Sequence, residues 1–215
     1  MTILSKNDQR GRSMVEMLGV LAIIGVLSVG GISGYSKAMA KFKLTKAQDQ
    51  MSMLLMNIRT AFATSPSYEG LDNTSAVYFA IAPGDMYSGT ISSNMTSVDH
   101  LNNAFGGAAH VFECNKENYK DDNGKEIKCY GLPTTAATTS KDQFFAIAMS
   151  NLGREACVSM ASSDWGTDGL ISIQVIPKTK TLTQKVAADL PITMMEAGRI
   201  CGNYGETASI VWTYY

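Results

Sequence analysis

The feature that most constrains this chain is an N-terminal stretch with no charged side chain between Met17 and Ser36. About 20 residues of α-helix rise roughly 30 Å, which is the thickness of the hydrocarbon core of a membrane. A cleaved secretory signal is the competing interpretation, because small residues around Gly30 resemble a cleavage site, yet the apolar run continues past them. The stretch therefore predicts a helix that needs lipid or other helices on every side.

The apolar stretch continues without a helix breaker into an amphipathic pattern. The first proline is Pro66, and apolar residues before it recur at steps of three and four, namely Leu44, Ala47, Met51, Leu54, Ile58 and Ala61. We predict one helix from about Ser13 to Ala63, roughly 75 Å long at 1.5 Å per residue. Its second half has a single apolar face, which predicts packing against a globular domain.

Charged residues stand on both sides of the apolar stretch. Glu16 lies at its start, where a charge is costly and is usually retained for a specific partner. Lys6, Arg10 and Arg12 precede it, with Asp8 among them. A count of Lys and Arg does not place the N-terminus in the cytoplasm, because four lysines follow the stretch, Lys37, Lys41, Lys43 and Lys46. These lysines could meet anionic lipid headgroups.

The chain has four cysteines, and all of them follow the apolar stretch: Cys114, Cys129, Cys157 and Cys201. None is in a C-x-x-C pair and neither histidine has metal-ligand spacing from a cysteine, so we expect no zinc site. Two disulfides in an oxidising compartment are favoured over four buried thiols in a cytosolic core. Of the three possible connectivities, Cys114–Cys129 has support from the Asn123-Gly124 turn between them, which predicts a hairpin.

The remaining pattern predicts a β-rich domain with short helices. Ser140-Lys141-Asp142-Gln143 has the form of a capping box, and we expect it to open a helix with Phe144 and Phe145 on its apolar face, which either runs to Met160 or is broken at Gly153. Further expected elements are a strand at 169–176, a short helix from Leu190-Pro191 through Cys201 and a strand at 207–215. Asp121 and Asp122 suggest calcium ligands, but the spacing of an EF-hand loop is absent, so we expect no metal.

The sequence contains no pattern that predicts an enzyme. It lacks a glycine-rich phosphate loop, a nucleophile elbow and a histidine placed near a cysteine or carboxylate motif. Lys and Arg number 18 against 19 Asp and Glu, so no basic excess indicates nucleic-acid binding. We expect no catalytic residue and no cofactor.

The segment from Gly11 to Leu18, GRSMVEML, resembles the prepilin peptidase site of type IV pilins and pseudopilins. The resemblance implies a leader that ends at Gly11, cleavage before Arg12, N-methylation of Arg12 and a role in assembly for Glu16, the fifth mature residue. The family usually has Phe, Met or Leu where this chain has Arg12. The segment 101–112 resembles one that is common in type IVb pilins. Residues 144–157 resemble the segment that leads into the large C-terminal disulfide loop, which implies Cys157–Cys201.

The resemblance implies the α+β pilin fold, in which a long N-terminal helix packs on an antiparallel β-sheet head. Residues 1–11 would form a cytoplasmic leader, 12–36 the transmembrane and filament-core helix, 37–63 the amphipathic half of the helix, and 64–215 the head with its disulfide loops. The implied function is that of a major, type IVb-like structural subunit of a type IV pilus, which moves from the bacterial inner membrane into an extracellular filament.

The implied partners are further copies of the chain in a helical filament, a prepilin peptidase, the pilus assembly machinery and the inner membrane. One alternative within the same superfamily is a minor pilin or a type II secretion pseudopilin. An alternative of another class is a membrane-anchored periplasmic domain that binds a ligand or acts as an enzyme.

Overall fold

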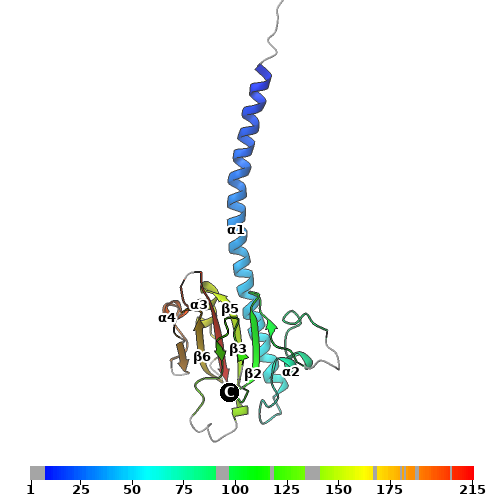
Figure 1. The fold of residues 1–215 in the computed structure, drawn as a ribbon, viewed down its shortest axis with the longest axis vertical. Helices are drawn as coiled ribbons and strands as arrows, with labels where there is room; N and C mark the ends of the chain where they lie inside the picture. The colour runs from blue at the N-terminus through cyan, green and yellow to red at the C-terminus, as the bar shows by residue number, and fades with distance from the viewer. Residues whose placement is uncertain are drawn as a thin grey trace, which may run out of the picture. The chain divides into compact units, whose positions relative to one another are not determined.

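The structure is a computed structural model that describes residues 8–90, 97–116, 119–133, 141–166, 169–179, 181, 183–186, 189–203 and 205–215. The chain divides into two compact units, Met1–Lys43 and Leu44–Tyr215. The helix α1, Asp8–Ala61, accounts for the described part of the first unit and supplies the first helix of the second (Figure 1). A stretch of 54 residues, which in most proteins contains two or more helices or strands, therefore forms a single helix here.

Within the second unit, α1 buries the apolar face that its periodicity predicts. Ala47, Met51, Leu54 and Ile58 are each fully buried in the main core. Gln50 lies on the same face, where its side-chain amide donates to the Asp85 carboxylate at 2.9 Å and its carbonyl oxygen accepts from the Ala104 N–H at 3.0 Å. The helix ends at Ala61, close to the predicted end, and turns that precede Pro66 follow it.

The second unit is built on a six-stranded antiparallel sheet in the order β1-β2-β5-β8-β6-β7 (Figure 1). The strands are β1 Leu101–Asn102, β2 Ala108–Glu113, β5 Phe145–Gly153, β6 Leu170–Pro177, β7 Thr183–Val186 and β8 Thr207–Tyr214. A separate hairpin pairs β3, Tyr119–Lys120, with β4, Glu126–Ile127. The helices α2 Asn73–Tyr78, α3 Arg154–Ser162 and α4 Met194–Ile200 connect or flank the strands.

Both faces of the sheet are buried at its centre. One face joins α1 in the main core, to which β5 and β8 contribute Ile147, Met149, Ile210 and Trp212. The other face holds a smaller apolar cluster that includes Phe112, Ala146, Ala148, Ile176 and Val211. Alternate residues of a strand point to opposite faces, so the two central strands need an apolar side chain at nearly every position.

This double burial explains why the helix predicted from Ser140 to Met160 is wrong. Residues 145–153 form the central strand β5, and only the last part of the predicted segment, α3, is helical. A strand buried on both faces has a continuous apolar run, which a single sequence does not distinguish from a buried helix. Gly153 is the N-cap residue at which the chain changes from strand to helix. Ser140 lies outside the described residues, and Lys141–Gln143 form one 3-10 turn.

The other expected elements agree with the structure within a few residues. The Asn123-Gly124 turn joins β3 to β4, with Gly124 at a positive φ of 75° as such a turn requires. The strands β6 and β8 cover the predicted segments 169–176 and 207–215. The helix α4 starts later than predicted, at Met194, because Thr193 caps it by accepting a hydrogen bond from the Glu196 N–H.

Candidate functional site

The first unit presents an apolar helix surface that nothing in the unit covers. Thirteen large apolar side chains from Met14 to Tyr35 are each more than half exposed. At about 1.5 kcal/mol or more for each side chain, leaving them all in water costs on the order of 20 kcal/mol. From Met14 onward α1 is long enough and apolar enough to cross a membrane. This statement rests on the length and the composition of the helix alone. The surface is therefore one that lipid or neighbouring helices must cover.

Glu16 interrupts the start of this apolar surface. Its side chain is exposed, and none of the side chains that the structure describes, from Met14 onward, forms an ion pair with it. Gly11 and Arg12 lie on the same helix within about 8 Å of helix rise from Glu16, while their side chains are outside the description. The predicted processing and assembly residues thus share one helical segment.

The small and polar residues of the apolar segment suit close contact with apolar surroundings. A Cβ atom built on Gly19, Gly25, Gly30, Gly31 or Gly34 would meet no atom within 4 Å other than the adjacent residues and the nearby backbone of the same helix. The Ser28 hydroxyl donates to the Ile24 carbonyl at 2.7 Å, and the Ser36 hydroxyl donates to the Ile32 carbonyl at 3.0 Å. Both hydroxyls are therefore satisfied within the helix. The backbone is helical through Gly30-Gly31, and local unwinding there during assembly stays a prediction.

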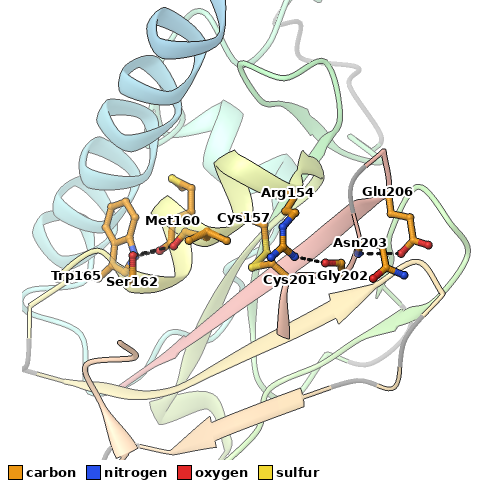
Figure 2. The surroundings of a disulfide bond; sticks show 10 residues. Arg154, Cys157, Met160, Ser162, Trp165, Cys201, Gly202, Asn203 and Glu206 are labelled. Carbon is orange, nitrogen blue, oxygen red and sulfur yellow. Dashed lines mark hydrogen bonds between the residues drawn. A yellow bond between two sulfur atoms is a disulfide. The ribbon is translucent and has the colours of Figure 1, made fainter. Parts of the chain in front are cut away.

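A buried disulfide joins Cys157 of α3 to Cys201, the residue that follows α4, with Cα atoms 5.7 Å apart. Figure 2 shows polar contacts on both sides of the bond. On one side the Trp165 indole N–H donates to the Met160 carbonyl at 2.6 Å, and on the other the Arg154 guanidinium donates to the Gly202 carbonyl. These contacts tie both ends of the 44-residue loop to α3.

A second disulfide joins Cys114, which follows β2, to Cys129, which follows β4, across a separation of 15 residues. The Cα atoms are 5.5 Å apart, and the Phe144 side chain packs against the pair. The Cys114 N–H donates to the Phe144 carbonyl at 2.9 Å, which continues the β2–β5 pairing by one residue. In the structure the four cysteines are therefore joined in the two pairs that the sequence analysis expects.

The acidic residues of the β3–β4 hairpin are engaged in holding the hairpin to the sheet. Asp121 accepts hydrogen bonds from the N–H groups of Asn123 and Lys125 and from the Ser209 hydroxyl, at 2.8 to 2.9 Å. Asp122 accepts from the Ser150 hydroxyl at 2.5 Å. Among the described residues, no group of three or more His, Cys, Asp or Glu could hold a metal ion. The two carboxylates thus have a structural role here.

His110 is a buried core residue of β2. Its Nδ1 atom lies 3.1 Å from the Asn73 side-chain amide nitrogen, and the Tyr119 ring packs over it. Burial, with a smaller contribution from His100, lowers the pKa of His110 to about 4. The ring is therefore uncharged near neutral pH, and it is the uncharged form that is buried in the core.

Buried and partly buried amides contribute anchors that sequence reasoning did not identify. The Asn73 side chain accepts from the Val111 N–H at 2.9 Å and donates to the Asp99 carbonyl at 2.7 Å, which joins α2 to β2. The Asn103 amide donates to the Ser150 carbonyl at 2.8 Å, and the Asn57 amide donates to the Ile81 carbonyl at 2.8 Å. In a turn-rich or helical segment, the sequence around a single Asn does not show whether its side chain forms such buried hydrogen bonds or lies on the surface.

The fold resembles that of a solved pilin. The crystal structure of the type IV b pilin from Salmonella typhi aligns with a TM-score of 0.50 and 17% identity, over 79% of this chain and 97% of that one. The bundle-forming pilus major structural subunit of Escherichia coli O111:H- is 23% identical over 98% of this chain and 96% of its own length. The chain is thus similar in sequence to a pilus subunit and in fold to a type IV b pilin.

A third pilin, the toxin coregulated pilin of Vibrio cholerae, is 26% identical over 158 residues, which are 74% of this chain and 59% of that protein. This chain therefore spans less than two thirds of the toxin coregulated pilin but almost all of the bundle-forming pilus subunit. No protein-family model matches the chain. The predicted fold class, a long N-terminal helix with an antiparallel sheet in an α+β domain, is confirmed.

Proposed function

We propose that the chain is a structural subunit of a type IV pilus and that it polymerises through α1. The observation that carries this proposal is the uncovered apolar surface from Met14 to Tyr35. The alignment with a major pilus subunit over 98% of this chain supports the same role. In a filament, neighbouring α1 helices would cover this surface. Such a bundle keeps the apolar side chains out of water when the subunit leaves the membrane.

The proposed maturation follows from the resemblance of the Gly11–Leu18 segment. A prepilin peptidase would remove residues 1–11, which creates a free α-amino group on Arg12 that a methyltransferase could modify. Pairing this amine with Glu16 of a neighbouring subunit would offset the cost of a carboxylate in apolar surroundings, since a charge there is stable only with a partner. The subunit would wait in the bacterial inner membrane and end in an extracellular filament.

The exposed glycines support close packing in such a bundle. Residues without a side chain allow helix backbones to approach, as at helix contacts in membranes, and the space around the glycines of α1 is open in the isolated subunit. The α+β head would then form the outer surface of the filament. We infer a non-enzymatic role, because both curated relatives are named as pilins or pilus subunits.

The test is replacement of the Glu16 side chain in cells that carry a type IV pilus assembly system. We expect Glu16→Ala to leave membrane insertion and cleavage unchanged and to reduce sheared filaments severely, as measured by electron microscopy and immunoblotting of the sheared fraction. Glu126→Ala is the matched control, because that carboxylate is exposed on the head and, among the described side chains, its ion pair is with Lys128 at 3.4 Å. Filaments of normal number and length from Glu16→Ala would contradict the proposed mechanism.

A minor pilin or pseudopilin is the second candidate. The alignment with a major structural subunit over 98% of this chain favours the main proposal. Quantification of the chain in purified filaments distinguishes the two, since a major subunit accounts for most of the filament mass.

A further inference from the structure

We infer that Lys37, Lys41 and Lys43 form a cationic collar that binds the anionic headgroups of a lipid leaflet while the subunit waits in the membrane. The inference rests on the membrane-anchored stage of the proposed function and adds the class of lipid that the chain selects. All three lysine side chains are exposed and belong to the first unit.

The position of the collar along α1 matches a headgroup layer. The uncharged segment between Glu16 and Lys37 is about 30 Å long at the rise of an α-helix, which equals the thickness of a hydrocarbon core. When Glu16 lies at one boundary of the core, Lys37 lies at the other. Lys41 follows after about 6 Å of further rise, within the polar layer of roughly 5–8 Å on that side, and Lys43 after about 9 Å, at the outer edge of that layer.

The directions of the three side chains indicate a partner that surrounds the helix. At about 100° per residue, Lys37 and Lys41 are roughly 40° apart, whereas Lys43 is about 240° from Lys37. Lys43 therefore lies on a different side of the helix from the other two. A single docked protein contacts one side of a helix, while a headgroup layer meets every side. The geometry thus favours lipid.

The collar has no internal counter-charge. No acidic residue occurs between Glu16 and Asp49, and none of the three lysines forms an ion pair within the described residues. Lys46, one turn further along, differs in this respect, because its ammonium group lies 2.9 Å from the Asp85 carboxylate in the second unit. The ammonium groups of the collar are thus available for headgroup phosphates, whose negative potential attracts Lys and Arg close to a membrane.

Two aromatic side chains next to the collar agree with this location. Tyr35 is 67% exposed and Phe42 is 61% exposed. Tyrosine is enriched at membrane–water boundaries because its ring is apolar and its hydroxyl is polar. Tyr35 precedes the first lysine by two residues, and Phe42 stands between the other two. Headgroup contacts of this kind are reversible, so they hold the subunit without preventing its transfer into a filament.

The test uses the full chain in lipid bilayer nanodiscs with one added label. The cysteines of the wild-type chain are all in disulfides, so Ser36→Cys provides a single thiol for a fluorophore at the predicted boundary. Quenching of the label by brominated phosphatidylglycerol is compared with quenching by brominated phosphatidylcholine. We expect several-fold selection of the anionic lipid at low salt and its loss in 0.5 M NaCl, where charges about 10 Å apart are screened.

The variant Lys37→Gln/Lys41→Gln/Lys43→Gln should bring the ratio of the two lipids close to one. The control Lys120→Gln/Lys128→Gln/Lys141→Gln removes three exposed charges from the head and should retain the selection. Equal quenching by both lipids in the wild-type chain overturns the inference, and so does selection that persists in the collar variant. If the wild-type chain shows no lipid selection and the collar variant assembles filaments poorly, the lysines bind an acidic protein partner and the inference is wrong.

The same measurement separates this inference from the proposed function. Failure to assemble filaments, together with lipid selection that depends on the collar, rejects the pilus role and leaves the collar in place. Absence of quenching by either lipid shows that Ser36 is not at a membrane boundary and overturns the inference together with the membrane-anchored stage.

Discussion

Removing the Cys157–Cys201 disulfide should destabilise the head more than removing Cys114–Cys129. A crosslink stabilises chiefly by reducing the entropy of the unfolded chain, and the effect grows with the loop that it closes. The loops span 44 and 15 residues. For these lengths the chain-entropy relation gives about 4 and about 3 kcal/mol at 25 °C. Domains of this kind have total stabilities of roughly 5–15 kcal/mol, so either loss is large.

The two perturbations are the double variants Cys157→Ala/Cys201→Ala and Cys114→Ala/Cys129→Ala, which leave no unpaired thiol. Cys157 and Cys201 are almost completely buried, so the first variant also loses packing around the two sulfur atoms, which adds to the difference. Urea unfolding of the full chain in detergent provides the free energies. Trp165 and Trp212 report on it, since both are buried and their rings are 5.7 Å apart.

We expect the free energy of unfolding to fall by about 4 kcal/mol or more in the first variant and by about 3 kcal/mol in the second. Treatment of the unfolded wild-type chain with a reductant, followed by refolding under reducing conditions, should approach the combined loss. A larger loss from the short loop than from the long loop would refute the entropic argument. No loss from either variant would mean that the native protein does not contain these bonds.

Two further predictions concern processing and acid stability. Coexpression with a prepilin peptidase should remove residues 1–11 and leave Arg12 as the N-terminus, and the variant Gly11→Ala should be cleaved poorly. Measurement of the intact mass of the mature chain checks this prediction. An uncut chain, or a cut near Gly30, would contradict it. The pKa of His110 is about 4 in the folded chain, below its ordinary value of 6.5. The unfolded chain therefore binds the proton more readily, and stability falls as the pH decreases from about 6.5 to about 4, by up to roughly 3 kcal/mol from this residue. Unfolding curves of His110→Gln should show a smaller loss over that range, and equal losses in variant and wild type would count against this origin of the acid sensitivity.

The sequence predicts those helices and hairpins that have a clear local signal, either apolar residues at a regular spacing or a residue pair that is typical of a turn. The α1 helix has its second half amphipathic over Leu44–Ala61, and the burial of Met51 and Leu54 follows from that pattern. The β3–β4 hairpin follows from Asn123-Gly124, because glycine readily takes the positive φ that Gly124 has in the turn. In such segments local preference and tertiary packing agree, which makes the prediction reliable.

The sequence does not predict elements that are defined by tertiary burial. The strand β5 has apolar residues on both faces, and its preceding Ser-Lys-Asp-Gln segment resembles the start of a helix. The anchors Asn73 and Gln50 depend on partners that are distant in the chain, at Val111 and Asp85. For the proposed assembly site, Glu16 stands out because a charge is unusual in an apolar segment, whereas the partner proposed for it belongs to a neighbouring subunit and leaves no pattern beside it.

The central place of β8 in the sheet has a consequence for the order in which the sheet can form. Thr207–Tyr214 pairs with β5 on one side and with β6 on the other, although it follows both of them in the sequence. The two halves of the sheet have no direct strand pairing with each other until β8 inserts between them. A head whose N-terminal part emerges first, from a ribosome or across a membrane, therefore cannot join the two halves of its sheet until β8 has emerged. Both cysteine pairs precede β8 in the sequence, so oxidation can begin while the sheet is still incomplete.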